Sequence, residues 1–230
     1  MKSCRRNCLL GALGAALMAA GDLVLSMIPP NNTDSGLYLR EAYLSGGYPL
    51  WRPVFLLVTG IIGMVFYAFG IRAVYDQIRP ECKRSRWIVK YGGLVFLVSG
   101  AAFHFIIGSL AYWTTYLSQN VGREQAITFV KDYYDRFIPA LTILYIPMIA
   151  LMLVSLVAVL RGKTNMPKWT MVFHIVTWEI LLAGIPDIRQ ALGLPLTTAD
   201  YVMSQASGNA ACLIWFLACC VFSKKTDWEE

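Results

Sequence analysis

Three ionisable residues interrupt apolar stretches of this sequence: Asp22, His104 and Glu179. A charged side chain at the centre of a bilayer costs about 2.5–3.5 kcal/mol on insertion scales, so such residues face a bundle interior or a wet cavity. Two carboxyl groups and an imidazole in one protected site can exchange protons with a substrate or activate a water molecule. We therefore take these three residues as the candidate catalytic group.

The residues around His104 favour an interior position for its side chain. Gly100 and Gly108 lie one helical turn before and after it, and small residues let neighbouring helices approach closely. The other histidine, His174, is five residues from Glu179, which is about 140° around a helix. We expect His174 to lie outside the catalytic group.

Further polar residues fall at a similar depth in their apolar runs or nearer the predicted outer side. His104 and Glu179 lie within roughly 3 Å of the midpoints of their runs, and Asp22 lies roughly 6 Å toward the outside, from a rise of 1.5 Å per residue. A polar pocket open to the outer side follows from this shared depth. The predicted substrate-binding residues are Tyr67, Thr142, Tyr145, Gln205, Asn209, Asp187 and Arg189.

The composition indicates which elements hold these residues. Of the 230 residues, 57% are hydrophobic and 15% are charged, against about 25% charged in an ordinary globular domain. A membrane-spanning helix needs about 20 mostly apolar residues, and six such runs use nearly the whole chain. We predict an all-α, polytopic integral membrane protein, a six-transmembrane-helix bundle forming a single domain over 1–230. The predicted spans are 8–28, 53–75, 88–116, 137–160, 169–185 and 203–222.

The basic residues predict an orientation for this bundle. With the N-terminus inside, fourteen of the twenty lysines and arginines fall on the inner side and six on the outer side. Cytoplasmic loops of membrane proteins carry an excess of these residues, so we predict that both ends are inside (N-in, C-in). The expected location is a bacterial cytoplasmic membrane.

Two segments admit two interpretations. Basic residues before the first apolar run resemble a signal peptide, but apolar residues continue to Ile28, so we favour a retained helix. The connection 117–136 reads in part as an amphipathic helix at the membrane interface, and equally as an extension of the following span.

Three classes of function fit these residues. The lead hypothesis is a membrane-embedded acid–base enzyme acting on a hydrophobic or lipid-like substrate. The alternatives are a small proton-coupled transporter, which at this size would work as a homodimer, and a structural role in which the polar groups only hold helices together. We expect membrane lipids and an amphiphilic small molecule as partners, and no nucleic acid.

No metal and no cofactor are expected. A zinc site of Asp22, His104 and Glu179 is weakly supported, because the chain has only two histidines and no HExxH motif. Haem ligation by the two histidines is weaker still, since they differ by roughly 9 Å in depth.

Overall fold

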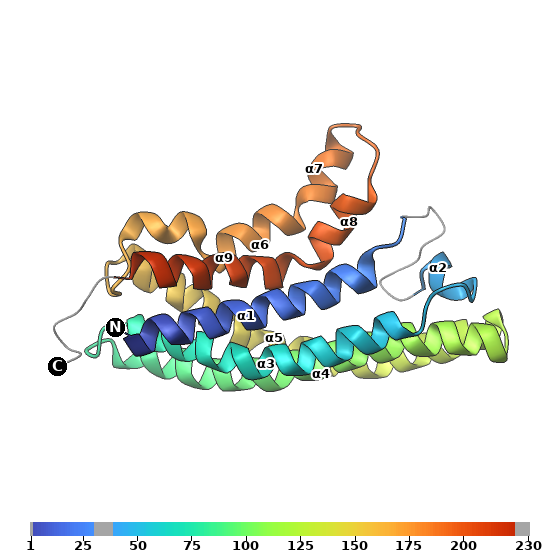
Figure 1. Ribbon diagram of the computed structural model, residues 1–230, viewed down its shortest axis with the longest axis horizontal. Coiled ribbons are helices and arrows are strands. Elements are labelled where there is room, and N and C mark those ends of the chain that lie inside the picture. The colour runs from blue at the N-terminus through green and yellow to red at the C-terminus, as the bar shows by residue number, and fades with distance from the viewer. Residues whose placement is uncertain (1, 30–38, 224–230) are drawn as a thin grey trace.

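The computed structural model describes residues 2–29 and 39–223, and within these residues the fold is all-α, as predicted (Figure 1). The helices are α1 (Lys2–Ser26), α2 (Glu41–Leu44), α3 (Trp51–Gln77), α4 (Lys83–Asn120), α5 (Arg123–Leu160), the 3-10 helix η1 (Lys168–Phe173), α6 (Ile175–Ala183), α7 (Ile185–Ala191), α8 (Thr198–Gln205) and α9 (Ser207–Phe222). In this part of the chain, α1, α3 and α4 are each long and apolar enough to cross a bilayer. The count rises to six if each of three bent pairs is one span. The bundle is therefore compatible with a membrane protein.

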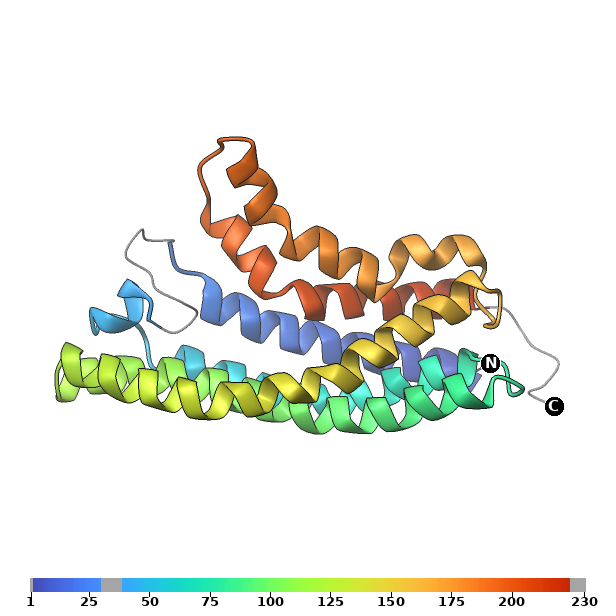
Figure 2. The same cartoon turned by 180° about the vertical axis from the view of Figure 1, so that it is seen from behind.

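The long helices lie antiparallel along one axis. α1 packs between α3 and α9, and α4 packs between α3 and α5 (Figure 1). Figure 2 shows α5 beside α4 at its start and moving away from it toward the C-terminal helices. α7 and α8 project from the bundle as a hairpin.

Glycines permit the closest helix contact, between α1 and α3. A Cβ atom on Gly14 would lie 2.6 Å from the carbonyl oxygen of Gly63, and one on Gly11 would lie 2.5 Å from the Cα of Gly70. Both distances are too short for a real side chain. The two backbones can approach this closely only because these positions carry no Cβ.

Exposed aromatic side chains mark two levels along α4. Trp87 and Tyr91 are exposed near its start, and Trp113 and Tyr116 near its end. Trp87 and Trp113 are about 39 Å apart along the helix, close to the roughly 40–45 Å of a bilayer with its headgroup regions. Tryptophan and tyrosine are enriched at both interfaces of a membrane, so these two levels are compatible with a bilayer between them.

In the connection 117–136, the residues from Arg123 onward belong to the same helix as the following apolar run. α4 continues to Asn120 and the chain turns at Gly122. α5 is then helical throughout, from Arg123 to Leu160. α5 bends by 47° between Ala140 and Tyr145. Pro139 and Pro147 flank the bend, and each removes a backbone N–H from the helix.

The predicted span 169–185 is not one helix. This segment forms η1, and the helix is interrupted at His174 before α6 begins. The His174 side chain accepts a hydrogen bond from the N–H of Val176 and so caps α6. A second bend of 41° separates η1–α6 from α7 at Gly184. Pro186, which cannot donate to the carbonyl of Leu182, accounts for this second bend.

The predicted span 203–222 is also interrupted. α8 and α9 meet at Ala206 with a bend of 64°. Ser207 and Gly208 follow this junction, and such pairs are a common cause of sharp helix kinks. The bend turns the first residues of α9 toward α1 and α6, where they meet the candidate acids.

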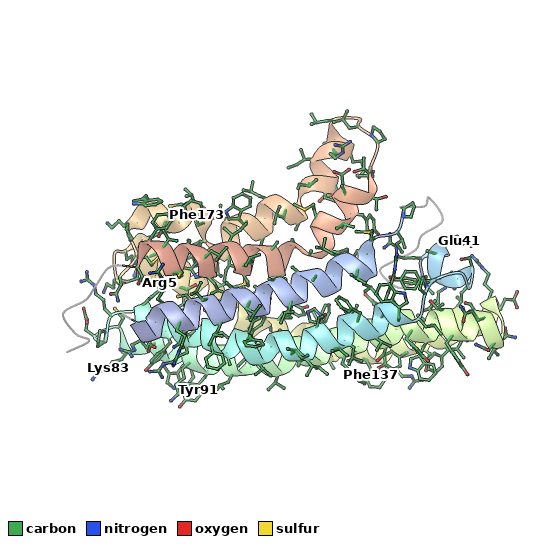
Figure 3. The ribbon with its side chains drawn as sticks, viewed as in Figure 1. Arg5, Glu41, Lys83, Tyr91, Phe137 and Phe173 are labelled. Atoms are coloured by element: carbon green, nitrogen blue, oxygen red, sulfur yellow. The ribbon has the colours of Figure 1, made fainter. Side chains whose placement is uncertain are left out.

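Basic segments gather at one end of the bundle. Arg79 donates its N–H to the carbonyl of Lys163, so the α3–α4 and α5–η1 connections lie side by side. Figure 3 shows Arg5 and Lys83 at this end and Glu41 at the opposite end.

Candidate functional site

Asp22 is held by a chain of hydrogen bonds that joins three helices. Asn209, on the third residue of α9, donates from its side-chain nitrogen to Asp22 Oδ2 on α1 at 2.6 Å. The Tyr67 hydroxyl on α3 donates to Asn209 Oδ1 at 2.7 Å. The asparagine therefore uses its donor on the acid and its acceptor on the phenol. This arrangement fixes one carboxylate oxygen of Asp22 and leaves the other for His104.

His104 lies beside the second oxygen of this acid. Its Nδ1 is 4.0 Å from Asp22 Oδ1, and the residue is only 7% exposed. Gly60 on α3 makes room for the ring, because a Cβ there would lie 2.6 Å from the Cβ of His104. Among the described residues, no hydrogen bond to the His104 ring is present. A buried imidazole in this state is available to a ligand.

Glu179 reaches the same region from α6. Its Oε1 accepts a hydrogen bond from the Ser207 hydroxyl, at the first residue of α9, over 3.0 Å. Its Oε2 is buried and has no hydrogen-bond partner in the part of the chain that the structure describes. Both acids thus lie at the first turn of α9, where the helix dipole favours negative charge.

The three candidate catalytic residues line one cavity of about 560 Å³. This volume lies in the range of roughly 300–1,000 Å³ that is typical of small-molecule sites. Most of the lining side chains are apolar, and among the polar ones Asn209 bonds Asp22 and Ser207 bonds Glu179. The predicted site residues on its wall are Asp22, His104, Glu179, Tyr67, Tyr145, Gln205 and Asn209.

The cavity reaches the surface on the side of the bundle. Ile149 of α5 lines it and is 49% exposed, and Gln205 and Gly208 at the α8–α9 junction line it and are exposed. Ile149 lies well inside α5, with exposed Ile146 and Leu153 on either side. The opening between α5 and the α8–α9 junction therefore lies on the flank of the bundle, among apolar side chains.

Three predicted substrate-binding residues lie away from the cavity wall. Thr142 is exposed, and its hydroxyl donates to the carbonyl of Ile138. Asp187 is exposed on α7. Arg189 pairs with Asp200 at 2.9 Å and donates to the carbonyl of Pro195, which closes the α7–α8 hairpin.

His174 is also outside the cavity, where we expected it. Its Nε2 lies 3.0 Å from the Ser155 hydroxyl, and its ring packs on Trp215. Since Nδ1 accepts from the N–H of Val176, the neutral ring carries its proton on Nε2 and donates it to Ser155. This histidine connects α5 to the start of α6.

The sequence pattern did not indicate two parts of the site. Ser207, the partner of Glu179, lies at a helix junction that hydropathy does not reveal. Arg40 lines a smaller pocket of about 80 Å³ that shares Asp22 and Gln205 with the main cavity. The Arg40 guanidinium lies 4.4 Å from the centre of the Tyr201 ring. Ser207 stands next to Gly208 in the sequence, whereas Arg40 stands between Leu39 and Glu41 in a predicted connection.

The described residues contain no group of three or more His, Cys, Asp or Glu side chains arranged to hold a metal ion. Asp22 and His104 are close, but Glu179 does not complete a ligand set with them. The zinc alternative therefore gains no support from the geometry of these three residues.

Comparison with known protein families matches residues 1–226 to one described as "Family of unknown function (DUF6796)". Because the match covers nearly the whole chain, the protein belongs to this family. No curated protein and no solved structure matches the chain.

Proposed function

We propose that this member of the DUF6796 family is a membrane-embedded acid–base enzyme acting on an amphiphilic, lipid-like substrate. One observation carries the proposal: Asp22 and His104 face each other at 4.0 Å on the wall of a mostly apolar cavity that opens on the flank of the bundle. A substrate with a hydrocarbon tail can enter such an opening from the bilayer without crossing water.

The proposed roles follow from the contacts. Asn209 fixes Asp22, and Asp22 orients and polarises the imidazole of His104, which exchanges the proton with the substrate or with an attacking water. Catalytic hydrogen bonds are often long before substrate binds, so a separation of 4.0 Å suits this pair. Glu179 is the second acid and faces the same substrate.

An isotope experiment tests this function for hydrolysis and for proton exchange at the same time. The full-length protein is reconstituted into liposomes of phosphatidylethanolamine, phosphatidylglycerol, ceramide and long-chain N-acylamines, in water enriched in both deuterium and oxygen-18. Mass spectrometry of the recovered lipids then detects hydrolysis as oxygen-18 and proton exchange at carbon as deuterium. We expect label in one lipid class with the wild-type protein.

Labelling by three variants, compared with labelling by the wild type, shows whether the candidate residues are responsible. Asp22→Asn and His104→Gln are expected to lower labelling by about 10²–10⁴-fold, the usual contribution of general acid–base catalysis. Glu124→Gln, an exposed acid at the start of α5, should leave it unchanged. No label with the wild type, or full labelling by His104→Gln, would contradict the enzyme. If these variants lowered only stability, the structural role would be favoured.

A proton-coupled transporter is the second candidate, and the interrupted helices favour it. Many transporters bind substrate where helices break near the middle of the bilayer. Here the bend at Ala206 lies next to Ser207, which donates to Glu179, and Gln205 and Gly208 line the cavity. In this case the protein would work as a homodimer, and Glu179→Gln should abolish proton-driven uptake of an amphiphile into proteoliposomes. Unchanged uptake would count against it.

We also propose that both ends lie inside a bacterial cytoplasmic membrane. The charge bias of fourteen basic residues to six supports this orientation, as does the gathering of basic segments at one end. A membrane-impermeant maleimide should label a cysteine placed at Glu124 in intact cells, and one placed at Lys83 only after permeabilisation. The reverse pattern would show the opposite orientation.

A further inference from the structure

We infer that the ligand of this cavity is an amphiphilic amine, with a cationic nitrogen between Glu179 and His104 and a hydrocarbon tail along the apolar wall. The inference rests on the proposed function, because it names the substrate class of the same site. It specifies that the headgroup of the ligand is positively charged and where that headgroup lies. The acid–base proposal leaves both points open.

The charge of the wall is the first argument. Asp22 and Glu179 both face the cavity, and among the described residues that line it none is a lysine or an arginine. Arg40 lies in the smaller neighbouring pocket that shares Asp22. Asp22 therefore also lines a pocket that contains a basic side chain. Glu179 has none on the cavity wall and is the acid that a cationic ligand would meet.

Unused hydrogen-bonding atoms give the second argument. Glu179 Oε2 is buried without a partner among the described residues, and Ser207 occupies only Oε1. Buried polar atoms of native proteins nearly always have partners, since leaving one unpaired costs about 1–3 kcal/mol. The His104 ring, more than nine-tenths buried on the same wall, is also without a hydrogen bond in the described chain. A protonated amine supplies several N–H donors to such acceptors, whereas an alcohol supplies one O–H.

Aromatic rings complete the site. Phe103 of α4 and Tyr145 of α5 line the cavity and pack edge to face at 5.4 Å. Tyr67 packs in the same way on Phe96, at 5.7 Å, and on Phe216, at 5.6 Å. All five rings belong to the wall. Aromatic faces attract cations most strongly in desolvated sites, so the same wall suits both the charged head and the tail of an amine.

Equilibrium binding of matched C12 probes tests the inference. Radiolabelled dodecylamine, dodecanol and dodecanoic acid are added to the full-length protein in phosphatidylcholine nanodiscs, and partition into protein-free nanodiscs is subtracted. The zwitterionic lipid avoids attraction of the amine to the bilayer. We expect dodecylamine to bind at least about tenfold more tightly than dodecanol, as one charge-assisted hydrogen bond implies, and dodecanoic acid to bind most weakly.

Variants locate the headgroup. Glu179→Gln keeps the shape of the side chain and should weaken dodecylamine binding about tenfold without changing dodecanol binding, which also reports that the cavity is intact. Glu124→Gln makes the same chemical change on the exposed start of α5 and should leave both affinities unchanged. Equal affinities for the amine and the alcohol would overturn the inference. So would a loss with Glu179→Gln that is the same for both probes.

The two proposals fail in different ways. Tight, Glu179-dependent amine binding without isotope labelling of any lipid would defeat the enzyme and leave the ligand class standing. Labelling of a neutral lipid by a protein that does not prefer dodecylamine would defeat the ligand class and leave the enzyme standing.

Discussion

Asn209 donates its side-chain N–H to Asp22 over 2.6 Å, so α9, the last helix in the described part of the chain, positions an acid on α1. The same amide accepts from Tyr67, which adds the third helix. An amide flanked by one acceptor and one donor has a single orientation that satisfies both. This contact fixes which oxygen of Asp22 faces His104.

A double-mutant cycle measures this hydrogen-bond chain. Tyr67→Phe should lower the free energy of unfolding by about 0.6–2 kcal/mol, the range for hydrogen bonds between membrane helices. Asn209→Leu should cost more, because it leaves both Asp22 and the Tyr67 hydroxyl without partners. In the Asn209→Leu background, Tyr67→Phe should cost almost nothing. Additive losses, measured by reversible unfolding in mixed micelles, would show that the two contacts are independent.

Gly60→Ala tests the packing of His104 on α3. The added Cβ would lie 2.6 Å from the Cβ of His104, so the helices must separate, and we expect a loss of about 1–3 kcal/mol in stability. Gly47→Ala is the matched control, since its Cβ would meet nothing closer than the Ser45 hydroxyl at 3.8 Å. Equal effects of the two substitutions on the unfolding free energy would contradict the close approach of α3 and α4.

The break before α6 can be tested at His174. Asparagine is a good helix N-cap, so His174→Asn should keep the bond to the N–H of Val176 while losing the one to Ser155. His174→Ala loses both and should be less stable than His174→Asn by about 1 kcal/mol. The comparison is made by thermal unfolding of the two variants. An asparagine variant no better than alanine would argue against the capping role.

The contact between α2 and the start of α5 predicts a pH dependence outside the membrane. Arg123 donates to both oxygens of Glu41, at 2.7 and 2.8 Å, and these hydrogen bonds lower the pKa of the Glu41 carboxyl. A lowered folded-state pKa stabilises the fold above the unfolded pKa, and this contribution is lost as pH falls through the folded value. Glu41→Gln should therefore destabilise the protein at about pH 7 and match the wild type at acidic pH. A difference that persists in acid would refute the ion pair.

Hydropathy predicted the parts of this fold that depend on continuous apolar sequence. α1, α3 and α4 follow from such runs, and the shared depth of Asp22 and His104 along their helices correctly indicated that they could meet. The breaks at Gly184 and Ala206 were not predicted, because hydropathy averages over residues and does not show where backbone hydrogen bonds are lost.

The depth of a residue along its helix also does not show which way its side chain points around the helix axis. Thr142 has a depth like that of Tyr145, yet its side chain is exposed while Tyr145 lines the cavity. The two are three residues apart on α5, beside its bend between Ala140 and Tyr145. Asp187 and Arg189 were placed by extending a straight span past Gly184, where the chain in fact turns into the α7–α8 hairpin.

Photo-crosslinking tests the central claim most directly, that an amphiphile enters from the flank of the bundle and reaches His104. A dodecylamine analogue with a diazirine in the middle of its chain is irradiated with the full-length protein in nanodiscs, and the modified residues are identified by peptide mass spectrometry. We predict modification of cavity residues such as Phe103, Tyr145 and Ile149, removed by excess dodecylamine and reduced in Glu179→Gln. Modification confined to exposed residues such as Leu94 and Val98, and insensitive to competition, would contradict the account.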